Sequence, residues 1–268
     1  VDAIIELAGP GVTSTRQLAA LGITDSRIET AVARGELLRL RRGSVLPTST
    51  WAAAEPAERH RLAVHAALIA YPTAVVSHTS AAQILGLPLA GWTPRVIPRQ
   101  SERPDGSSDA RASGRIGNSS ALLGIPTVHL TILGRRRIGA WLRIHGSPLP
   151  AAHWTTIGTV PLTGYSRTLA DTASMLKPGP ALALADAAVR QIVGMIDPHA
   201  DQRQAVQDER GRAAARRAVS AVIDTCALRP GIDAARRALA LVDPASESVL
   251  ESISRWHMHR HRISMPQC

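Results

Sequence analysis

The stretch VTSTRQLAALGITDSRIETAVARGELLRLRRGSVL, residues 12–46, decides the fold that we expect near the N-terminus. Ser14 is a preferred helix-capping residue and precedes a predicted helix over residues 15–21. Gly22 follows in the position where a left-handed residue ends a helix. A second helix is predicted over residues 25–34. Two short helices joined by a glycine-containing turn are typical of a helix-turn-helix.

The second predicted helix has one apolar and one polar face. Ile28, Ala31 and Val32 recur at the i, i+3, i+4 spacing of a buried helix face. The polar positions point outward, where the side chains of a recognition helix meet the base edges of DNA. These outward residues are Ser26, Arg27, Thr30 and Arg34.

A basic ribbon follows the two helices. Residues 37–42 alternate apolar and basic side chains, Gly43 turns the chain, and residues 44–46 can pair back. Because successive side chains of a strand point to opposite faces, the leucines are expected to face the core and the arginines to face away. We therefore place Leu38 and Leu40 inward, Arg39 and Arg41 outward, and Arg42 at the tip.

Helices and ribbon together predict a winged helix-turn-helix that binds double-stranded DNA. Arginines on the wing are well placed to contact phosphates, while the second helix can reach base edges. The net charge of +10 favours a polyanionic partner. The alternative is a helical hairpin followed by an ordinary ribbon, whose charges only keep the protein soluble.

Composition limits the class of protein. The 268 residues contain no Phe and only 3% aromatic residues, so the core is expected to consist of Leu, Ile, Val and Ala. Two cysteines cannot form a disulfide framework or a cysteine zinc site, which indicates a reducing compartment. No apolar run approaches the ~18 residues of a membrane span, and the first residues lack a signal-peptide pattern. We expect a cytoplasmic protein without cofactors that contacts no membrane.

The expected fold class is α+β and mainly helical. The winged helix-turn-helix, residues 1–50, precedes a mixed α+β middle domain, residues 51–177. Within that domain, the polar segment of about 100–120 is predicted to be a mobile loop. A helical region, residues 178–243, and a last helical segment, residues 244–268, follow.

Alternating residues predict the strands of the middle domain and composition predicts a long helix after it. Residues 128–132 and 141–145 alternate as strands. Residues 159–163 predict a further strand, which Pro161 would place at a sheet edge. Residues 203–228, rich in Ala and Arg, predict one long helix.

Two segments with histidines invite a catalytic or metal-binding interpretation. Ser77, His78 and Ser80 lie close in sequence, but no nucleophile-elbow glycines surround them, and helix capping explains them better. The alternating histidines of residues 257–261 would place only the i, i+4 pair on one helix face. A solvated chain end explains them better than a metal site.

Two charged features remain open. Arg135, Arg136 and Arg137 form a second basic cluster, which is either a solvated hairpin turn or, on the face of the wing, a phosphate-contacting patch. Asp186 lies on an otherwise apolar predicted helix, so a buried partner for its carboxylate is of interest.

Further short motifs follow the winged helix in a recognisable order. They are VSHTSAA at 76–82 with LGL at 85–87, IH at 144–145, VPLT at 160–163 with SRTLAD at 166–171, and ADA at 185–187. Their order resembles the AbiEi-type antitoxin and transcriptional-regulator family, over about Gly11 to Pro266.

The resemblance implies that the winged helix binds operator DNA and represses its own operon, which in the family can include a nucleotidyltransferase-like toxin. A cognate toxin and a second copy of the chain are therefore candidate partners beside double-stranded DNA. The residues to which the resemblance assigns DNA binding are Arg27, Thr30, Arg34, Arg39, Arg41 and Arg42.

Many members of the family end in a nuclease-like domain, whose first helix resembles SESVLES at 246–252. There a Glu assists metal binding, but the strands that should supply the other ligands are absent before Cys268, so no metal centre and no enzyme activity are expected. Glu247 and Glu251 then are i, i+4 residues on an exposed helix face. The alternatives are a truncated, inactive endonuclease-like protein and an antitoxin that acts mainly by binding a protein.

Overall fold

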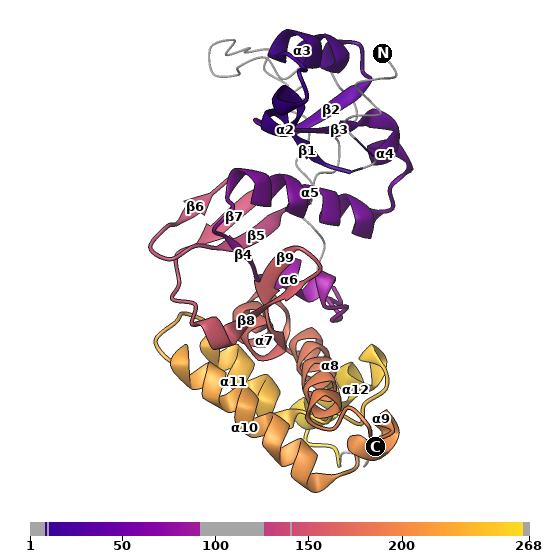
Figure 1. Cartoon of the computed structure of the whole chain (residues 1–268). Coiled ribbons are helices and arrows are strands. Elements are labelled where there is room, and N and C mark those ends of the chain that lie inside the picture. Colours follow the sequence, from indigo (N-terminus) through magenta and orange to yellow (C-terminus); the bar gives the residue numbers. More distant parts are fainter. Residues whose placement is uncertain (1–8, 10, 92–125, 140, 265–268) are drawn as a thin grey trace, which may run out of the picture. The chain divides into compact units, whose positions relative to one another are not determined.

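The computed structural model describes residues 9, 11–91, 126–139 and 141–264 (Figure 1). The segment of about 100–120, predicted as a mobile loop, lies outside these described residues. The chain divides into two compact units, which do not follow the predicted boundaries after residues 50, 177 and 243. Unit 1 comprises Val1–Ala74, Pro94–Val128 and Arg136–Ile144, and unit 2 comprises Val75–Thr93, His129–Arg135 and His145–Cys268.

Helices and strands occur in both units, so the protein is α+β as expected. Unit 1 contains the two predicted short helices, α2 (Thr15–Ala20) and α3 (Asp25–Ala33). Ser14 caps α2 through a capping box, because its Oγ accepts a hydrogen bond from the Gln17 N–H at 3.1 Å while the Gln17 side chain accepts one from the Ser14 N–H. Gly22, with φ +82°, ends the first helix in a left-handed turn.

A three-stranded antiparallel sheet accompanies these helices. Its strands are β1 (Thr13–Ser14), β2 (Leu37–Arg41) and β3 (Ser44–Pro47), in the order β1-β3-β2. The ribbon of β2 and β3 was predicted, whereas β1 was not. A strand of two residues has too few alternating positions to be recognised from sequence.

The core of unit 1 lies between the helices and the sheet. Ile28, Ala31 and Val32 of α3 are buried there, as predicted, with Leu37 and Val45 from the sheet. Leu38 and Leu40 are buried as well, on the opposite face of β2. Next to the sheet are α4 (Thr48–Ala53) and α5 (Pro56–Ala70), which both contact β2 and β3. The ribbon is therefore covered on both faces.

The strands of unit 2 surround the short β4 (Val75–Val76). It pairs antiparallel with β5 (Val128–Thr131) and parallel with β9 (Val160–Thr163), while β8 (Trp154–Ile157) pairs with the outer side of β9. The prediction that Pro161 places its strand at a sheet edge is wrong, because Pro161 lies opposite Thr156 of β8. The exposed edge strand β8 does not alternate apolar and polar residues, so the sequence did not reveal it. In unit 1, β6 (Arg137–Ile138) pairs antiparallel with β7 (Leu142–His145), of which only His145 belongs to unit 2.

Helices build the rest of unit 2 around α8 (Pro178–Ile196), which packs most extensively against four of them (Figure 1). Although α8 is long and apolar enough to cross a membrane, more than half of its most apolar window is buried inside the protein, as in the core helix of a globular unit. The surrounding helices are α7 (Tyr165–Thr172), α10 (Glu209–Thr225), α11 (Ile232–Leu241) and α12 (Val249–Arg260).

The long helix predicted over residues 203–228 is wrong, because it is two helices. The short α9 (Gln202–Ala205) ends before Asp208, whose carboxylate accepts hydrogen bonds from the Arg210 and Gly211 N–H groups and starts α10. Asp is a preferred N-cap, and this local signal overrides the continuous Ala and Arg pattern.

The carboxylate of Asp186, which lies on an otherwise apolar helix, has a buried partner. Its Oδ2 accepts a hydrogen bond from Arg255 of α12 at 2.9 Å, and its Oδ1 accepts one from the Asp243 N–H at 2.7 Å. Burial raises the pKa of the Asp186 carboxyl, although hydrogen bonds from Ser252 and Asp243 and the Arg255 charge oppose the shift. The ion pair between Arg255 and Asp186 connects α12, the predicted start of a nuclease-like domain, to α8.

The turn before α11 is tightly packed. Gly231, the N-cap of α11, has φ +83°, a conformation that L side chains rarely adopt. A Cβ atom at this position would also lie 2.5 Å from the Cβ of Ser174. This Ser174 belongs to the short 3₁₀ helix η3 (Ala173–Met175) that follows α7.

Candidate nucleic-acid interface

The outward face of α3 carries the residues that the sequence assigns to base reading. Ser26, Arg27, Thr30 and Arg34 are all exposed. Arg27, Thr30 and Arg34 are spaced i, i+3, i+7 and so form one stripe along the helix. Thr30 Oγ1 donates a hydrogen bond to the Ser26 carbonyl at 2.9 Å, which fixes the hydroxyl against its own helix. The stripe presents two guanidinium groups to solvent.

The three wing arginines have three different environments. Arg39 is ion-paired, with its Nη2 2.6 Å from Oε1 of Glu29 on α3. Arg41 is half-buried, and its guanidinium carbon lies 4.2 Å from the ring centre of Trp141. Arg42, at the tip, is exposed. The expectation that Arg39 and Arg41 both face away from the core therefore needs correction.

A β-bulge explains why the alternation fails in the wing. Arg39 pairs with Val45 and Arg41 pairs with Ser44, so the register shifts between the two arginines. The extra residue of a bulge bends the strand and redirects the side chains that follow it. Arg39, before the bulge, shares a face with Leu37 by ordinary alternation, whereas Arg41, after it, packs against the ring of Trp141.

The Arg41 contact includes a second aromatic residue, Tyr71. The guanidinium carbon of Arg41 is 5.1 Å from the Tyr71 ring centre, and its Nη1 is buried without a hydrogen-bond partner in the described part of the chain. Burial lowers the pKa of Arg41, which the Tyr71 hydroxyl partly offsets. Cation–π contact of this kind stabilises the packing of the wing base and draws Arg41 away from solvent.

Part of the second basic cluster adjoins the wing. Arg137 of β6 donates a hydrogen bond to the Tyr71 hydroxyl at 3.0 Å, so Arg41 and Arg137 meet at the same tyrosine. Its neighbour Arg136 is exposed. This arrangement within unit 1 favours the phosphate-contacting interpretation of residues 136 and 137 over a solvated turn.

The predicted capping role of Ser77 and Ser80 is wrong. Ser77 is the N-cap of α6 (His78–Ile84), but its side chain makes no capping hydrogen bond. Its Oγ instead lies 2.9 Å from Nδ1 of His78 and accepts a hydrogen bond from Thr131, while Ser80 Oγ accepts one from the His129 N–H at 2.9 Å. Both serines are fully buried.

A catalytic triad is nevertheless not formed around His78. The Asp171 carboxylate approaches the ring at 3.9 Å, but on Nδ1, the nitrogen that also faces Ser77. A triad needs the nucleophile and the carboxylate on different ring nitrogens, because the base must take a proton on one side while it is oriented from the other. The group is a buried polar network.

The acidic residues of the supposed nuclease helix have a structural role. Glu251 helps to cap α12, since its carboxylate accepts hydrogen bonds from Ser248 Oγ and from the Glu247 N–H, while its own N–H donates to Ser248 Oγ. These contacts lower the pKa of Glu251. Glu247 precedes the first residue of α12, so the expectation that it shares an exposed helix face with Glu251 is wrong.

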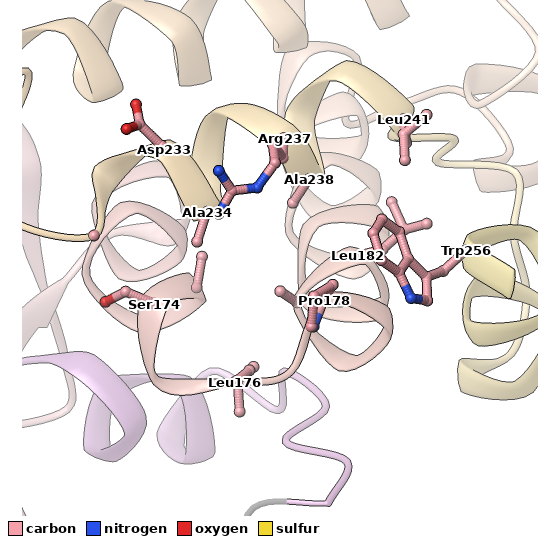
Figure 2. A pocket seen from close by; sticks show the side chains of 13 residues that line it. Ser174, Leu176, Pro178, Leu182, Asp233, Ala234, Arg237, Ala238, Leu241 and Trp256 are labelled. Atoms are coloured by element: carbon pink, nitrogen blue, oxygen red, sulfur yellow. The ribbon is translucent and has the colours of Figure 1, made fainter. Parts of the chain in front are cut away.

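Unit 2 contains a pocket with a volume of about 340 Å³, a size at the lower end of small-molecule sites. Figure 2 shows Trp256 on the α12 side and Arg237 and Asp233 on the α11 side, with Leu182 and Pro178 of α8 between them. The carboxylate of Asp233 is ion-paired with Arg236. Arg237 also lines the pocket, and it has no ion-pair partner in the described part of the chain. The lining combines apolar side chains with a carboxylate and a guanidinium, so the pocket can accept a small molecule that has both apolar and polar groups.

Comparison with known proteins finds no family model that matches the chain and no curated protein that is similar to it.

Proposed function

We propose that residues 12–46 form a winged helix-turn-helix and that the protein is a DNA-binding transcriptional regulator. The observation that carries the proposal is the exposed stripe of Arg27, Thr30 and Arg34 on a helix whose other face is buried. The strand order β1-β3-β2 after a helix pair is compatible with a winged helix. We further propose an antitoxin-like autorepressor in the cytoplasm, on the resemblance of its motifs.

In this proposal the contacts divide between α3 and the wing. The α3 stripe reads base edges in the major groove, while Arg42 contacts a phosphate. Arg39 orients the wing through Glu29, and Arg41 has a packing role. Arg136 extends the positively charged surface. The sequence assigns all three wing arginines to phosphate contacts, whereas in this proposal only Arg42 makes such a contact.

A mobility-shift titration with DNA from upstream of the gene tests the proposal. The variant Arg27→Ala/Arg34→Ala should weaken specific binding by about 1–3 kcal/mol for each base that an arginine no longer reaches. Arg42→Ala should weaken binding to all sequences alike and reduce the slope of log K against log salt by about 0.9.

Arg210→Ala/Arg217→Ala is the matched control, because it removes the same charge from exposed positions of unit 2. It should bind DNA like the unchanged protein. If the control weakens binding as much as the α3 double variant, net charge alone drives association and the proposed interface is refuted. Absence of any salt-dependent DNA binding would refute DNA binding itself.

A further inference from the structure

Three motifs that are far apart in sequence meet inside unit 2. His78 begins α6, His145 ends β7, and Asp171 lies in α7. His129 of β5 joins them. Among the described residues, the histidines at 78, 129 and 145 form the one group of metal-binding side chains whose ligand atoms all lie within 4.8 Å of one another.

The distances suit a single small ion. Nδ1 of His129 and Nε2 of His145 are 3.1 Å apart. Two nitrogens bound to one tetrahedral zinc at ~2.0–2.1 Å would be roughly 3.4 Å apart. The rings of His78 and His145 are stacked with centres 3.5 Å apart, so a shared ion requires a rotation of one ring. His145 is partly exposed, which gives an ion a path of entry.

The surroundings of the His78 ring suit a metal ligand. The ring is buried, and its Nδ1 has polar neighbours. Ser77 and Asp171 both face Nδ1, so the proton is expected there and Nε2 is available for a ligand.

Asp171 adds an outer partner of the kind that supports metal-bound histidines. Its Oδ1 accepts hydrogen bonds from Arg167 and Arg229. Its Oδ2, which faces His78, is buried without a hydrogen-bond partner in the described part of the chain. The two guanidiniums therefore lie against the oxygen that does not face the histidines.

The backbone conformation of His78 also supports a binding role, independently of the ring contacts. Its φ is +53°, in the left-handed region that non-glycine residues seldom occupy. Such strain persists only where the surroundings enforce it, and it is common at binding sites. Here it sets the ring of the first residue of α6 against His145.

We propose that His78, His129 and His145 together bind one divalent transition-metal ion, with Zn²⁺ as the best match. Three neutral imidazoles suit zinc better than calcium or magnesium, which prefer oxygen ligands. A water molecule or an anion would complete a tetrahedral site. The ion would join three segments of unit 2 that are far apart in sequence and so stabilise that unit.

The test uses the purified full chain after treatment with a chelator. Equilibrium dialysis against ZnCl₂ should give about one tightly bound ion per chain. His145→Ala should lower the affinity by more than about 100-fold, because loss of an outer-shell partner alone costs 10–100-fold. Zinc should raise the melting temperature of the unchanged protein and leave that of His145→Ala unaffected.

His257→Ala/His261→Ala is the matched control, because it removes two exposed histidines from the end of α12. It should retain the tight site. His145→Gln, which keeps a polar side chain of similar reach, should bind as poorly as the alanine variant, and both should retain the far-ultraviolet circular dichroism of the folded chain.

A Co²⁺ absorption spectrum reports the geometry, and its tetrahedral bands should disappear in both His145 variants. Equal zinc affinity in the unchanged protein and His145→Ala, or loss of the tight site in the terminal double variant, would overturn the proposal. Neither result would affect DNA binding, which the variants in unit 1 test.

Discussion

In unit 1, Arg27, Arg34 and Arg42 extend into solvent, whereas in unit 2 Arg167 and Arg255 are buried and each binds a buried aspartate. Both kinds of arginine contribute equally to the net charge of +10. Only the exposed kind can attract a polyanion, since the charge of the buried kind is compensated within a few ångströms. Loss of the first kind should therefore alter binding, and loss of the second should alter stability.

The largest effect is expected when Arg255 is removed, which tests the contrast between buried and exposed arginines. Arg255→Ala leaves the Asp186 carboxylate buried without its ion-pair partner, and removal of one partner of such a pair typically costs about 3–5 kcal/mol. Urea denaturation should show this loss of unfolding free energy. Arg217→Ala, in which an exposed arginine of unit 2 is removed, should change stability by less than about 0.5 kcal/mol. Similar losses in the two variants would mean that the buried pair is not a special contributor.

A second prediction concerns the buried ionisable group of α5. Burial, aided by the Arg61 charge, lowers the pKa of His60 from 6.5 to about 4. As pH falls below 6.5, His60 binds a proton in the unfolded chain but stays neutral in the folded chain. The free energy of unfolding therefore decreases until pH reaches about 4. Between pH 8 and pH 5 this group should account for a loss of about 2 kcal/mol.

The difference in unfolding free energy between these two pH values should be smaller by that amount in His60→Gln. His65→Gln, which replaces an exposed histidine of the same helix, should keep the full difference. If both variants lose stability with acid as the unchanged protein does, His60 is not the sensitive group.

The smallest effect is expected at the wing. The Glu29 side chain is 65% exposed, and an ion pair of this kind contributes about 0.2–1 kcal/mol, so Glu29→Ala should be close to neutral for stability. It frees the Arg39 guanidinium and removes a negative charge from α3. Non-specific DNA affinity should therefore rise at low salt in a filter-binding assay. A fall in affinity would indicate that the orientation of the wing matters more than its charge.

Local signals predicted unit 1 well. The helix cap of Ser14, the left-handed Gly22 and the buried Ile28 all depend on residues within one helix turn, and each was confirmed. The β-bulge between Arg39 and Arg41 was missed, because a shift in register depends on the pairing strand and not on the alternation of one strand.

The histidine cluster could not be predicted in the same way. His129 is 49 residues from Ser80, and Arg229 is 58 residues from Asp171, yet each pair is hydrogen-bonded. The residues next to each of these positions in the sequence give no local sign of such contacts. The available signal was that three of the short motifs contain His78, His145 and Asp171, whereas His129 lies outside every motif.

The packing of Gly231 limits how this sequence can change over evolutionary time. Gly43 also has a positive φ, but open space surrounds it, so an asparagine is admissible there. At position 231 any side chain meets the Cβ of Ser174. Glycine at position 174 would remove this contact, but a side chain at 231 would still carry the strain of the positive φ. Position 231 is therefore expected to remain glycine in every lineage of this protein.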